Sequence, residues 1–317
     1  MIRLLRIVSP FVVGLLLAAP AFAADQFINV LTGGTSGVYY PLGVALANDI
    51  GKALPGVKTS VQATKASVEN LNLLQAGRGE VAFTLGDSLS DAWKGSEDAG
   101  FKTPLKKLRG IAAIYPNYIQ IVARADAGIK TLADLKGKKI SVGAPKSGTE
   151  LNARAIFAAA GLSYKDFSKV EYLPFGESVE LMKNRQLDVT LQSAGLGVSA
   201  LRDLATSVDI TVFPIPADIV KKTNDPAYLV ATIPANTYRG QTADVTTAAV
   251  QNYLVTYDGV SNYTVYGITK ALWTGLDQLV AAHSAAKAID PKHALDGMPV
   301  PLHPGAEKYY KEAGLIK

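Results

Sequence analysis

The stretch GGTSGVYYP at residues 33–41 decides the fold that the sequence predicts. Before it, residues 26–32 alternate in polarity as a β-strand does, and after it apolar residues recur at helical spacing from Val38 to Ile50. Pro41 falls in the first helical turn, where its missing N–H group removes no hydrogen bond. A strand, a short turn of glycine and hydroxyl residues and a helix, in that order, are the building unit of an α/β protein.

The same unit recurs along the chain. A strand near residues 57–63 leads through a polar turn to a helix for which Ser67 is the predicted N-cap, and residues 81–85 form the next strand. Further on, a strand at residues 139–142 precedes a capping box that begins at Ser147 and opens another helix. Short helices between strands favour largely parallel sheets, so the sequence predicts two α/β lobes of similar architecture.

Two β-rich segments are predicted to cross between these lobes, namely residues 118–125 and 251–257. The first lobe would then contain residues 24–117 and 258–317, and the second lobe would contain residues 118–257. Crossings at both ends of the inserted lobe would act as a hinge, because a few residues at the ends of elements can absorb the change in backbone angles.

The N-terminus has the features of a secretory signal peptide. Arg3 and Arg6 provide a short positive region, residues 7–19 are almost entirely apolar, and the sequence AFA at residues 21–23 is a cleavage pattern. The apolar core is shorter than the ~20 residues that a membrane span requires. We therefore expect residues 1–23 to be removed and the mature chain to be a soluble protein of the periplasm.

Composition and charge exclude several classes of protein. Of 317 residues, 48% are hydrophobic and 19% are charged, which is typical of a folded chain and not of a disordered one. The chain has no cysteine, which excludes disulfides, cysteine zinc sites and thiol nucleophiles. Without Arg3 and Arg6, 30 basic residues stand against 27 acidic ones, a net charge of +3. No nucleic-acid partner is expected, because such proteins cluster basic residues on one face.

Signatures of catalysis and of metal binding are scarce. His283, His293 and His303 are ten residues apart, which matches no metal-ligand motif. Residues 143–149 approach a phosphate-binding loop but lack the lysine after its second glycine, and no G-x-S-x-G motif occurs. The sequence therefore predicts a binding protein without metal or cofactor. A secreted hydrolase is the less favoured alternative, because it would need a nucleophile, a base and an orienting acid, and no such trio stands out.

The candidate binding site is a set of helix N-termini that follow strands in both predicted lobes. Each such terminus offers free N–H groups and about half a positive charge, which suits a carboxylate or phosphate. Ligands of open parallel sheets bind at the carboxyl ends of the strands, where these turns lie. The predicted ligand-binding residues of the turns are Thr35, Ser36, Lys65, Ser67, Ser147 and Thr149.

Aromatic and acidic residues complete the predicted site. Adjacent helical residues point about 100° apart, so only one of Tyr39 and Tyr40 should face the cleft, and Tyr39 is taken as the ligand contact together with Tyr115. Asp87 is the predicted acceptor for an amino group of the ligand, should it carry one. Glu150 is the less favoured acceptor, because the capping box with Ser147 can occupy it.

The chain closely resembles the TAXI family, the solute-binding subunits of one class of tripartite ATP-independent periplasmic (TRAP) transporters. The resemblance implies an α/β fold of the type II periplasmic-binding-protein class, with two hinge-linked lobes around a ligand cleft. It also implies capture of a solute and its delivery to an ion-driven membrane permease. The matching motifs are GGTSGVYYP at 33–41, SVENL at 67–71, LADLKG at 132–137, VGAP at 142–145, SGTE at 147–150 and PVPLHPGA at 299–306.

The chain departs from the family pattern at three positions near the expected mouth of the cleft. Lys65 and Ala66 replace a Gly-Gly pair, residues 85–87 read LGD where the family often has QAD, and Ser193 lies where an aromatic residue or threonine is common. Lys65 beside a helix N-terminus favours an anion. These differences leave the ligand open among relatives, and Ser193 is included among the predicted ligand contacts.

These observations together predict a monomeric periplasmic subunit of a TAXI-type TRAP transporter. Its expected ligand is a small carboxylate, glutamate or a 2-oxoglutarate-like acid, and its expected partners are the membrane permease subunits. The alternative from another class is a secreted receptor subunit that senses a ligand for a signalling protein.

Overall fold

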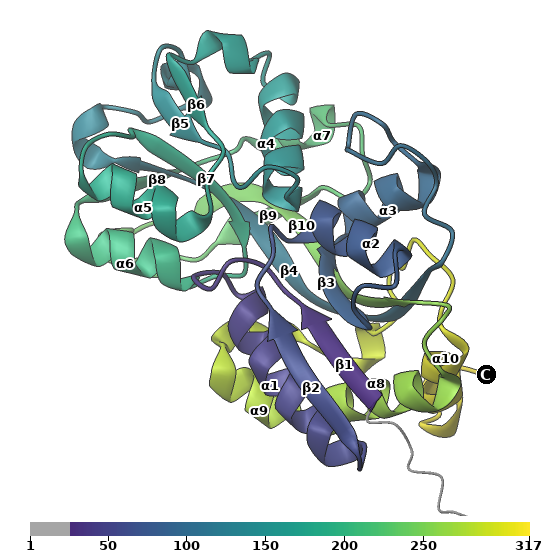
Figure 1. Cartoon of the computed structure of the whole chain (residues 1–317). Coiled ribbons are helices and arrows are strands. Elements are labelled where there is room, and N and C mark those ends of the chain that lie inside the picture. The colour runs from purple at the N-terminus through teal and green to yellow at the C-terminus, as the bar shows by residue number, and fades with distance from the viewer. Residues whose placement is uncertain (1–25) are drawn as a thin grey trace, which may run out of the picture.

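Ten strands within residues 26–317, the part of the chain that the computed structural model describes, form one continuous sheet (Figure 1). The strands are β1 (Gln26–Leu31), β2 (Val57–Gln62), β3 (Val81–Leu85), β4 (Leu108–Arg124), β5 (Lys139–Ser141), β6 (Lys169–Glu171), β7 (Val189–Ala194), β8 (Ile210–Phe213), β9 (Leu229–Ile233) and β10 (Val245–Tyr257). Their order is β2-β1-β3-β10-β4-β7-β5-β6, with β8 beside β4 and β9 beside β10. The predicted signal peptide, residues 1–23, lies outside the described residues.

Helices cover both faces of this sheet. They are α1 (Tyr39–Ala53), α2 (Ser67–Gln75), α3 (Gly86–Lys94), α4 (Gly148–Ala159), α5 (Phe175–Lys183), α6 (Ser199–Ser207), α7 (Ala217–Lys222), α8 (Asn262–Thr274), α9 (Leu276–Ala282) and α10 (Pro304–Glu312). The central strands β3 and β7 are buried at every position, as expected for strands covered on both faces, whereas the edge strand β2 alternates between half-buried and exposed residues. Among residues 26–317, no helix has the length and apolar character needed to cross a lipid bilayer.

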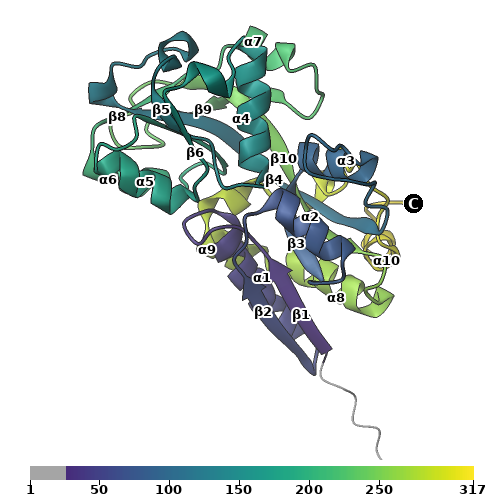
Figure 2. The ribbon, with the colours of Figure 1, turned by 45° about the horizontal axis from the view of Figure 1, so that its top comes forward.

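The molecule has two lobes (Figures 1 and 2). The first lobe contains β1, β2 and β3, paired in parallel, with α1 to α3 and α8 to α10. The second lobe contains β5, β6 and β7, also paired in parallel, together with β8, β9 and α4 to α7. The predicted α/β fold with two lobes of similar architecture is confirmed.

Two long antiparallel strands, β4 and β10, connect the lobes. They pair with each other from Leu108 opposite Tyr257 to Tyr118 opposite Ala249, with an irregular register between Gln251 and Tyr253 and again between Leu254 and Val255. Beyond this region β4 pairs with β7, and the start of β10 pairs with β9. The predicted crossing segment 251–257 lies within β10, and the predicted segment 118–125 lies within β4 except for its last residue, Ala125. We propose that the chain passes between the lobes near residue 117 in β4 and near residue 250 in β10; the predicted lobe boundaries stay a prediction.

Candidate functional site

A cavity lies between the lobes where the first turns of four helices meet. The residues that precede α1, α2, α4 and α5 all line it, and they are Val38, Ala66, Ser147 and Pro174. The cavity leaves about 80 Å³ for the centres of water-sized molecules. A cavity needs only roughly 10–15 Å³ of such space to hold one water, so this one has room for several. Covalently bonded atoms pack closer than waters, so the space suits a small organic molecule.

The electrostatic character of the cavity favours an anion. The N–H groups of Gly148 and Thr149, at the start of α4, have no hydrogen-bond acceptor among residues 26–317. Each helix N-terminus adds about half a positive charge. Lys65 carries the one charged side chain among the lining residues of the described chain, and none of these residues is acidic.

Two buried hydroxyl groups of the lining have no hydrogen-bond partner within the described chain. They are the phenol of Tyr115, on β4, and Oγ of Ser193, on β7. Burial raises the pKa of Tyr115 well above its ordinary value, which keeps this hydroxyl neutral and able to donate. A buried polar group without a partner costs about 1–3 kcal/mol, so such groups are rare in native proteins. Both hydroxyls are therefore available to a bound molecule.

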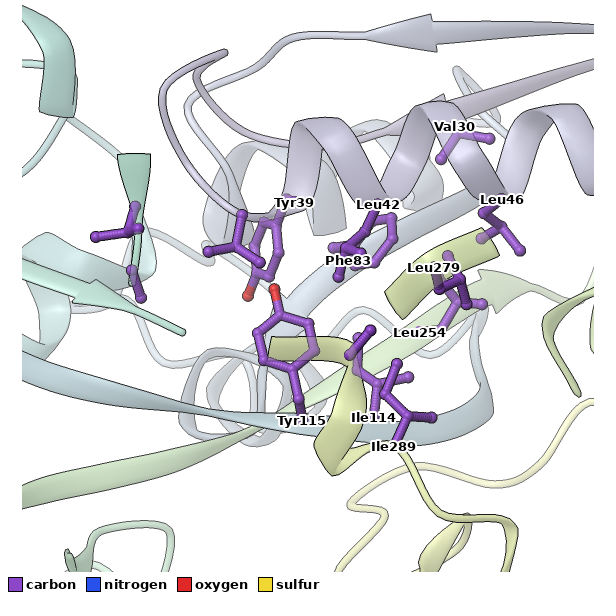
Figure 3. Packing of buried hydrophobic residues seen from close by; sticks show 14 of the residues in the cluster. Val30, Tyr39, Leu42, Leu46, Phe83, Ile114, Tyr115, Leu254, Leu279 and Ile289 are labelled. Carbon is purple, nitrogen blue, oxygen red and sulfur yellow. The ribbon is translucent and has the colours of Figure 1, made fainter. Parts of the chain in front are cut away.

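A chain of buried side chains connects the cavity to the crossing strands. The Tyr39 hydroxyl donates to Asn252 Oδ1, and Asn252 Nδ2 donates to the Tyr115 carbonyl at 2.6 Å and to Asn117 Oδ1 at 2.8 Å. Asn117 Nδ2 in turn donates to the Ser193 carbonyl at 2.9 Å. Figure 3 shows the hydroxyl groups of Tyr39 and Tyr115 directed toward each other beside the core beneath α1. Sequence reasoning missed both asparagines, although they fall close to the predicted crossings.

The structure brings seven of the ten predicted ligand-binding residues to this cavity. These seven are Tyr39, Lys65, Ser67, Tyr115, Ser147, Thr149 and Ser193. Tyr39 lies in the lining and Tyr40 does not, which agrees with the helical geometry. Thr35, Ser36 and Asp87 lie outside the lining. The role of the seven in binding stays a prediction.

Ser67 and Ser36 have structural roles that differ from the predicted ones. Helix α2 begins at Ser67 itself, and Ser67 Oγ accepts a bond from the Leu85 N–H at 3.1 Å, so the prediction that Ser67 is the N-cap is wrong. The Ser36 carbonyl accepts a bond from Ser199 Oγ at 2.8 Å and one from the Ala200 N–H at 3.4 Å. These two bonds join the first lobe to α6 of the second lobe.

The acidic candidates are both occupied by protein groups. Asp87 Oδ2 accepts bonds from Asn152 Nδ2 at 2.5 Å and from the Tyr228 hydroxyl at 2.8 Å, so the structure does not support Asp87 as the acceptor for an amino group of the ligand. The predicted capping box at Ser147 forms only in part. Ser147 Oγ accepts the Glu150 N–H at 3.1 Å, but the Glu150 carboxylate pairs with Arg154 at 2.5 Å.

The lobes are closed over the cavity. Besides the contacts of Ser36, the Glu69 N–H donates across the mouth to the Lys146 carbonyl at 3.3 Å. A Cβ atom at Gly148 would lie 2.6 Å from Leu85 Cδ1 and 2.7 Å from Ser67 Oγ. Only glycine allows α4 to approach the first lobe this closely.

Several solved structures share this fold, among them a periplasmic binding protein. PhnD1 from Prochlorococcus marinus, in complex with methylphosphonate, matches with a TM-score of 0.57 and 13% identity over 92% of this chain and 100% of that one. The alkanesulfonate-binding protein SsuA from Xanthomonas axonopodis pv. citri, bound to MOPS, gives a TM-score of 0.52 and 13% identity over 92% and 95% of the two chains. The periplasmic binding protein BugD matches with a TM-score of 0.58 and 12% identity over 92% of this chain and 98% of that one. The predicted periplasmic-binding-protein fold is thus confirmed.

Residues 26–317 contain no group of three or more histidine, cysteine, aspartate or glutamate side chains placed so that they could hold a metal ion. The sequence profile of the NMT1-like family matches residues 30–314. The chain therefore belongs to the NMT1-like family.

Proposed function

We propose that this protein binds a small carboxylate between its lobes in the periplasm and delivers it to the permease subunits of a TAXI-type TRAP transporter. The observation that carries the proposal is the convergence of four helix N-termini, from both lobes, on one cavity with unpaired N–H groups. Such termini bind anions through their N–H groups and their dipoles. Because the helices belong to different lobes, a single anion between them would hold the lobes together.

The lining favours a carboxylate without an amino group. An ammonium group in a closed cavity needs acidic or several carbonyl acceptors, and no aspartate or glutamate belongs to the lining of the described chain. The hydroxyls of Tyr115 and Ser193 could instead donate to a keto or second carboxylate oxygen. Between the two predicted ligands, a 2-oxoglutarate-like acid therefore suits the cavity better than glutamate.

The role in transport rests on the resemblance of six motifs to the TAXI family and on the fold. Two of the solved structures with this fold hold methylphosphonate and MOPS, whose phosphonate and sulfonate groups are anionic, in agreement with the proposed class of ligand. No catalytic step is proposed, because the lining combines no nucleophile, base and orienting acid. A sensing role is the alternative, and a neighbouring gene for a histidine kinase in place of a permease would favour it.

The experiment is titration calorimetry of the purified protein with 2-oxoglutarate, glutamate and methylphosphonate, after mass spectrometry of any molecule that the protein retains. We expect 2-oxoglutarate to bind at least tenfold more tightly than glutamate. The variants Tyr115→Phe and Ser193→Ala should each weaken binding about tenfold, the effect of losing about 1.4 kcal/mol. They should leave thermal stability nearly unchanged, because neither hydroxyl has a hydrogen-bond partner among residues 26–317.

Tyr263→Phe is the matched control, because Tyr263 is 67% exposed and does not line the cavity. Binding of none of the three anions, with no anion retained, would refute the proposal. Tight binding of methylphosphonate alone would replace the carboxylate with a phosphonate. Wild-type affinity in both Tyr115→Phe and Ser193→Ala would mean that the ligand lies elsewhere.

A further inference from the structure

A buried carboxylate bridges the two lobes outside the ligand cavity. Asp87 lies in the first turn of α3, in the first lobe, and its Oδ2 accepts bonds from Asn152 of α4 and from Tyr228, which precedes β9. Asn152 Nδ2 also donates to the Tyr228 hydroxyl at 2.8 Å. Asp87 is 4% exposed, Asn152 is fully buried and Tyr228 is 8% exposed. Both donors belong to the second lobe, so separating the lobes would break both bonds to Asp87.

We propose that Asp87, Asn152 and Tyr228 form a latch that holds the lobes closed, and that protonation of Asp87 strengthens it. Asp87 is then a positioning residue: it acts on ligand affinity through lobe closure and not through contact with the ligand. The proposal rests on the proposed function only in that closure traps a ligand. The latch itself can be measured without one.

The surroundings of Asp87 disfavour its negative charge. Burial raises the pKa of this carboxyl to about 6, although bonds from Tyr228 and the Ser88 N–H act in the opposite direction. Asp225, which precedes Tyr228, and Asp91 of α3 raise it further by charge repulsion. These two acids come from different lobes, so closure brings three carboxylates together.

Basic groups near the latch do not neutralise this cluster. Lys94 of α3 lowers the pKa of Asp91, but burial and Asp225 outweigh it and the pKa of Asp91 is raised. On α4, Arg154 pairs with Glu150 and also donates to the Asp98 carbonyl at 2.7 Å. The Asp87 carboxylate therefore has hydrogen-bond donors but no ion-pair partner among the described residues.

Asn152 is able to pair with the protonated form of Asp87. Its Oδ1 is buried and has no hydrogen-bond partner within residues 26–317. Rotation of the amide by half a turn would exchange Oδ1 and Nδ2, so that Oδ1 accepts the proton of the carboxylic acid. Oδ1 would then be paired, while Nδ2 would leave its acceptors on Asp87 and Tyr228, so the preference for the protonated form rests on burial of the carboxyl and on repulsion from Asp225 and Asp91.

The direction of the pH effect follows from linkage. When the lobes open, water reaches Asp87 and its pKa returns toward the ordinary value of 3.8, so the closed form binds the proton more tightly. Closure is therefore favoured as the pH falls through about 6 and is weakened as the pH rises above it. With these two pKa values, the closure constant increases about tenfold from pH 8 to pH 5.

The test is single-molecule energy transfer between dyes on the two lobes of the full mature chain without added ligand. The chain has no cysteine, so Arg78→Cys after α2 and Lys165→Cys after α4 give two unique labelling sites on exposed residues. We expect the population with the short distance to increase from pH 8 to pH 5. Asp87→Asn, which is neutral at every pH, should show the wild-type pH 5 distribution throughout. Tyr228→Phe should reduce the short-distance population at pH 8.

Ser199→Ala is the control, because it removes a bond between the lobes that does not titrate. It should lower the ratio of the short-distance to the long-distance population by the same factor at pH 5 and pH 8. A wild-type distribution that does not change with pH, or an Asp87→Asn variant that keeps the wild-type pH response, overturns the latch. Since no ligand is added, failure of 2-oxoglutarate to bind would leave these results unaffected and would refute only the proposed function.

Discussion

At the scale of single residues, Ala66 has a backbone conformation that glycine would adopt more easily. Its φ of 68° and ψ of −149° lie close to a region that is nearly exclusive to glycine and that costs other residues about 1–3 kcal/mol. Ala66→Gly removes this strain but adds about 0.5–1 kcal/mol of chain entropy in the unfolded state. We expect a net gain of about 1 kcal/mol, or about 2 °C in Tm, in thermal unfolding.

The control for this variant is Ala158→Gly, at an exposed position of α4, which should lose about 0.5–1 kcal/mol. A lower Tm for Ala66→Gly would contradict the account. The resemblance to the TAXI family also draws attention to Ala66, because the TAXI pattern usually has glycine at this position. The sequence could not assign partners to Asp87 or Asn252, since their partners lie 65 to 213 residues away and hydrogen bonds over such separations leave no local pattern.

At the scale of elements, the close approach of α4 to the first lobe depends on Gly148. A methyl group there would lie 2.6 Å from Leu85 Cδ1 in the closed form. Gly148→Ala should therefore act as a wedge: ligand binding is expected to weaken tenfold or more in calorimetry, while the variant still folds cooperatively. Gly51→Ala in α1 is the matched control, because its nearest neighbour would be Thr59 Oγ1 at 3.8 Å. Equal affinities of both variants would contradict the wedge.

The elements that the sequence predicts best are those with a regular apolar period and a clear turn. The strand expected at residues 26–32 corresponds to β1, Gln26–Leu31, and the one expected at 81–85 corresponds to β3, Val81–Leu85. The segment expected at 118–125 is only the second half of β4, Leu108–Arg124. Nothing in the local sequence indicates that this strand begins ten residues earlier, because its first half is an apolar run whose partner strand, β10, comes from a distant part of the chain.

At the scale of the whole molecule, two lobes follow from repetition of the strand–turn–helix unit, but their closed arrangement does not. Closure depends on contacts such as Ser36 with Ser199 and Asp87 with Asn152, which only the folded lobes bring together. The sequence predicts the part of the polar lining that comes from helix N-termini, because the turns that precede these helices can be recognised locally. The presence of Asn117 in the lining was not predictable, because Asn117 is positioned by the pairing of β4 with β10, where Asn252 Nδ2 donates to Asn117 Oδ1.

The closed form without a ligand leaves the N–H groups of Gly148 and Thr149 and the hydroxyls of Tyr115 and Ser193 unpaired around one cavity. In water the open form can hydrate all of these groups, so a ligand should shift the equilibrium toward closure. Small-angle scattering should then show a smaller radius of gyration when 2-oxoglutarate is added, and the ligand should stabilise the fold by about 2.7 kcal/mol at a hundredfold excess over Kd. Gly148→Ala should remain expanded under the same conditions. Tight binding with an unchanged radius would mean that the ligand enters lobes that are already closed, and the proposed hinge, near residue 117 in β4 and residue 250 in β10, would then have no part in capture.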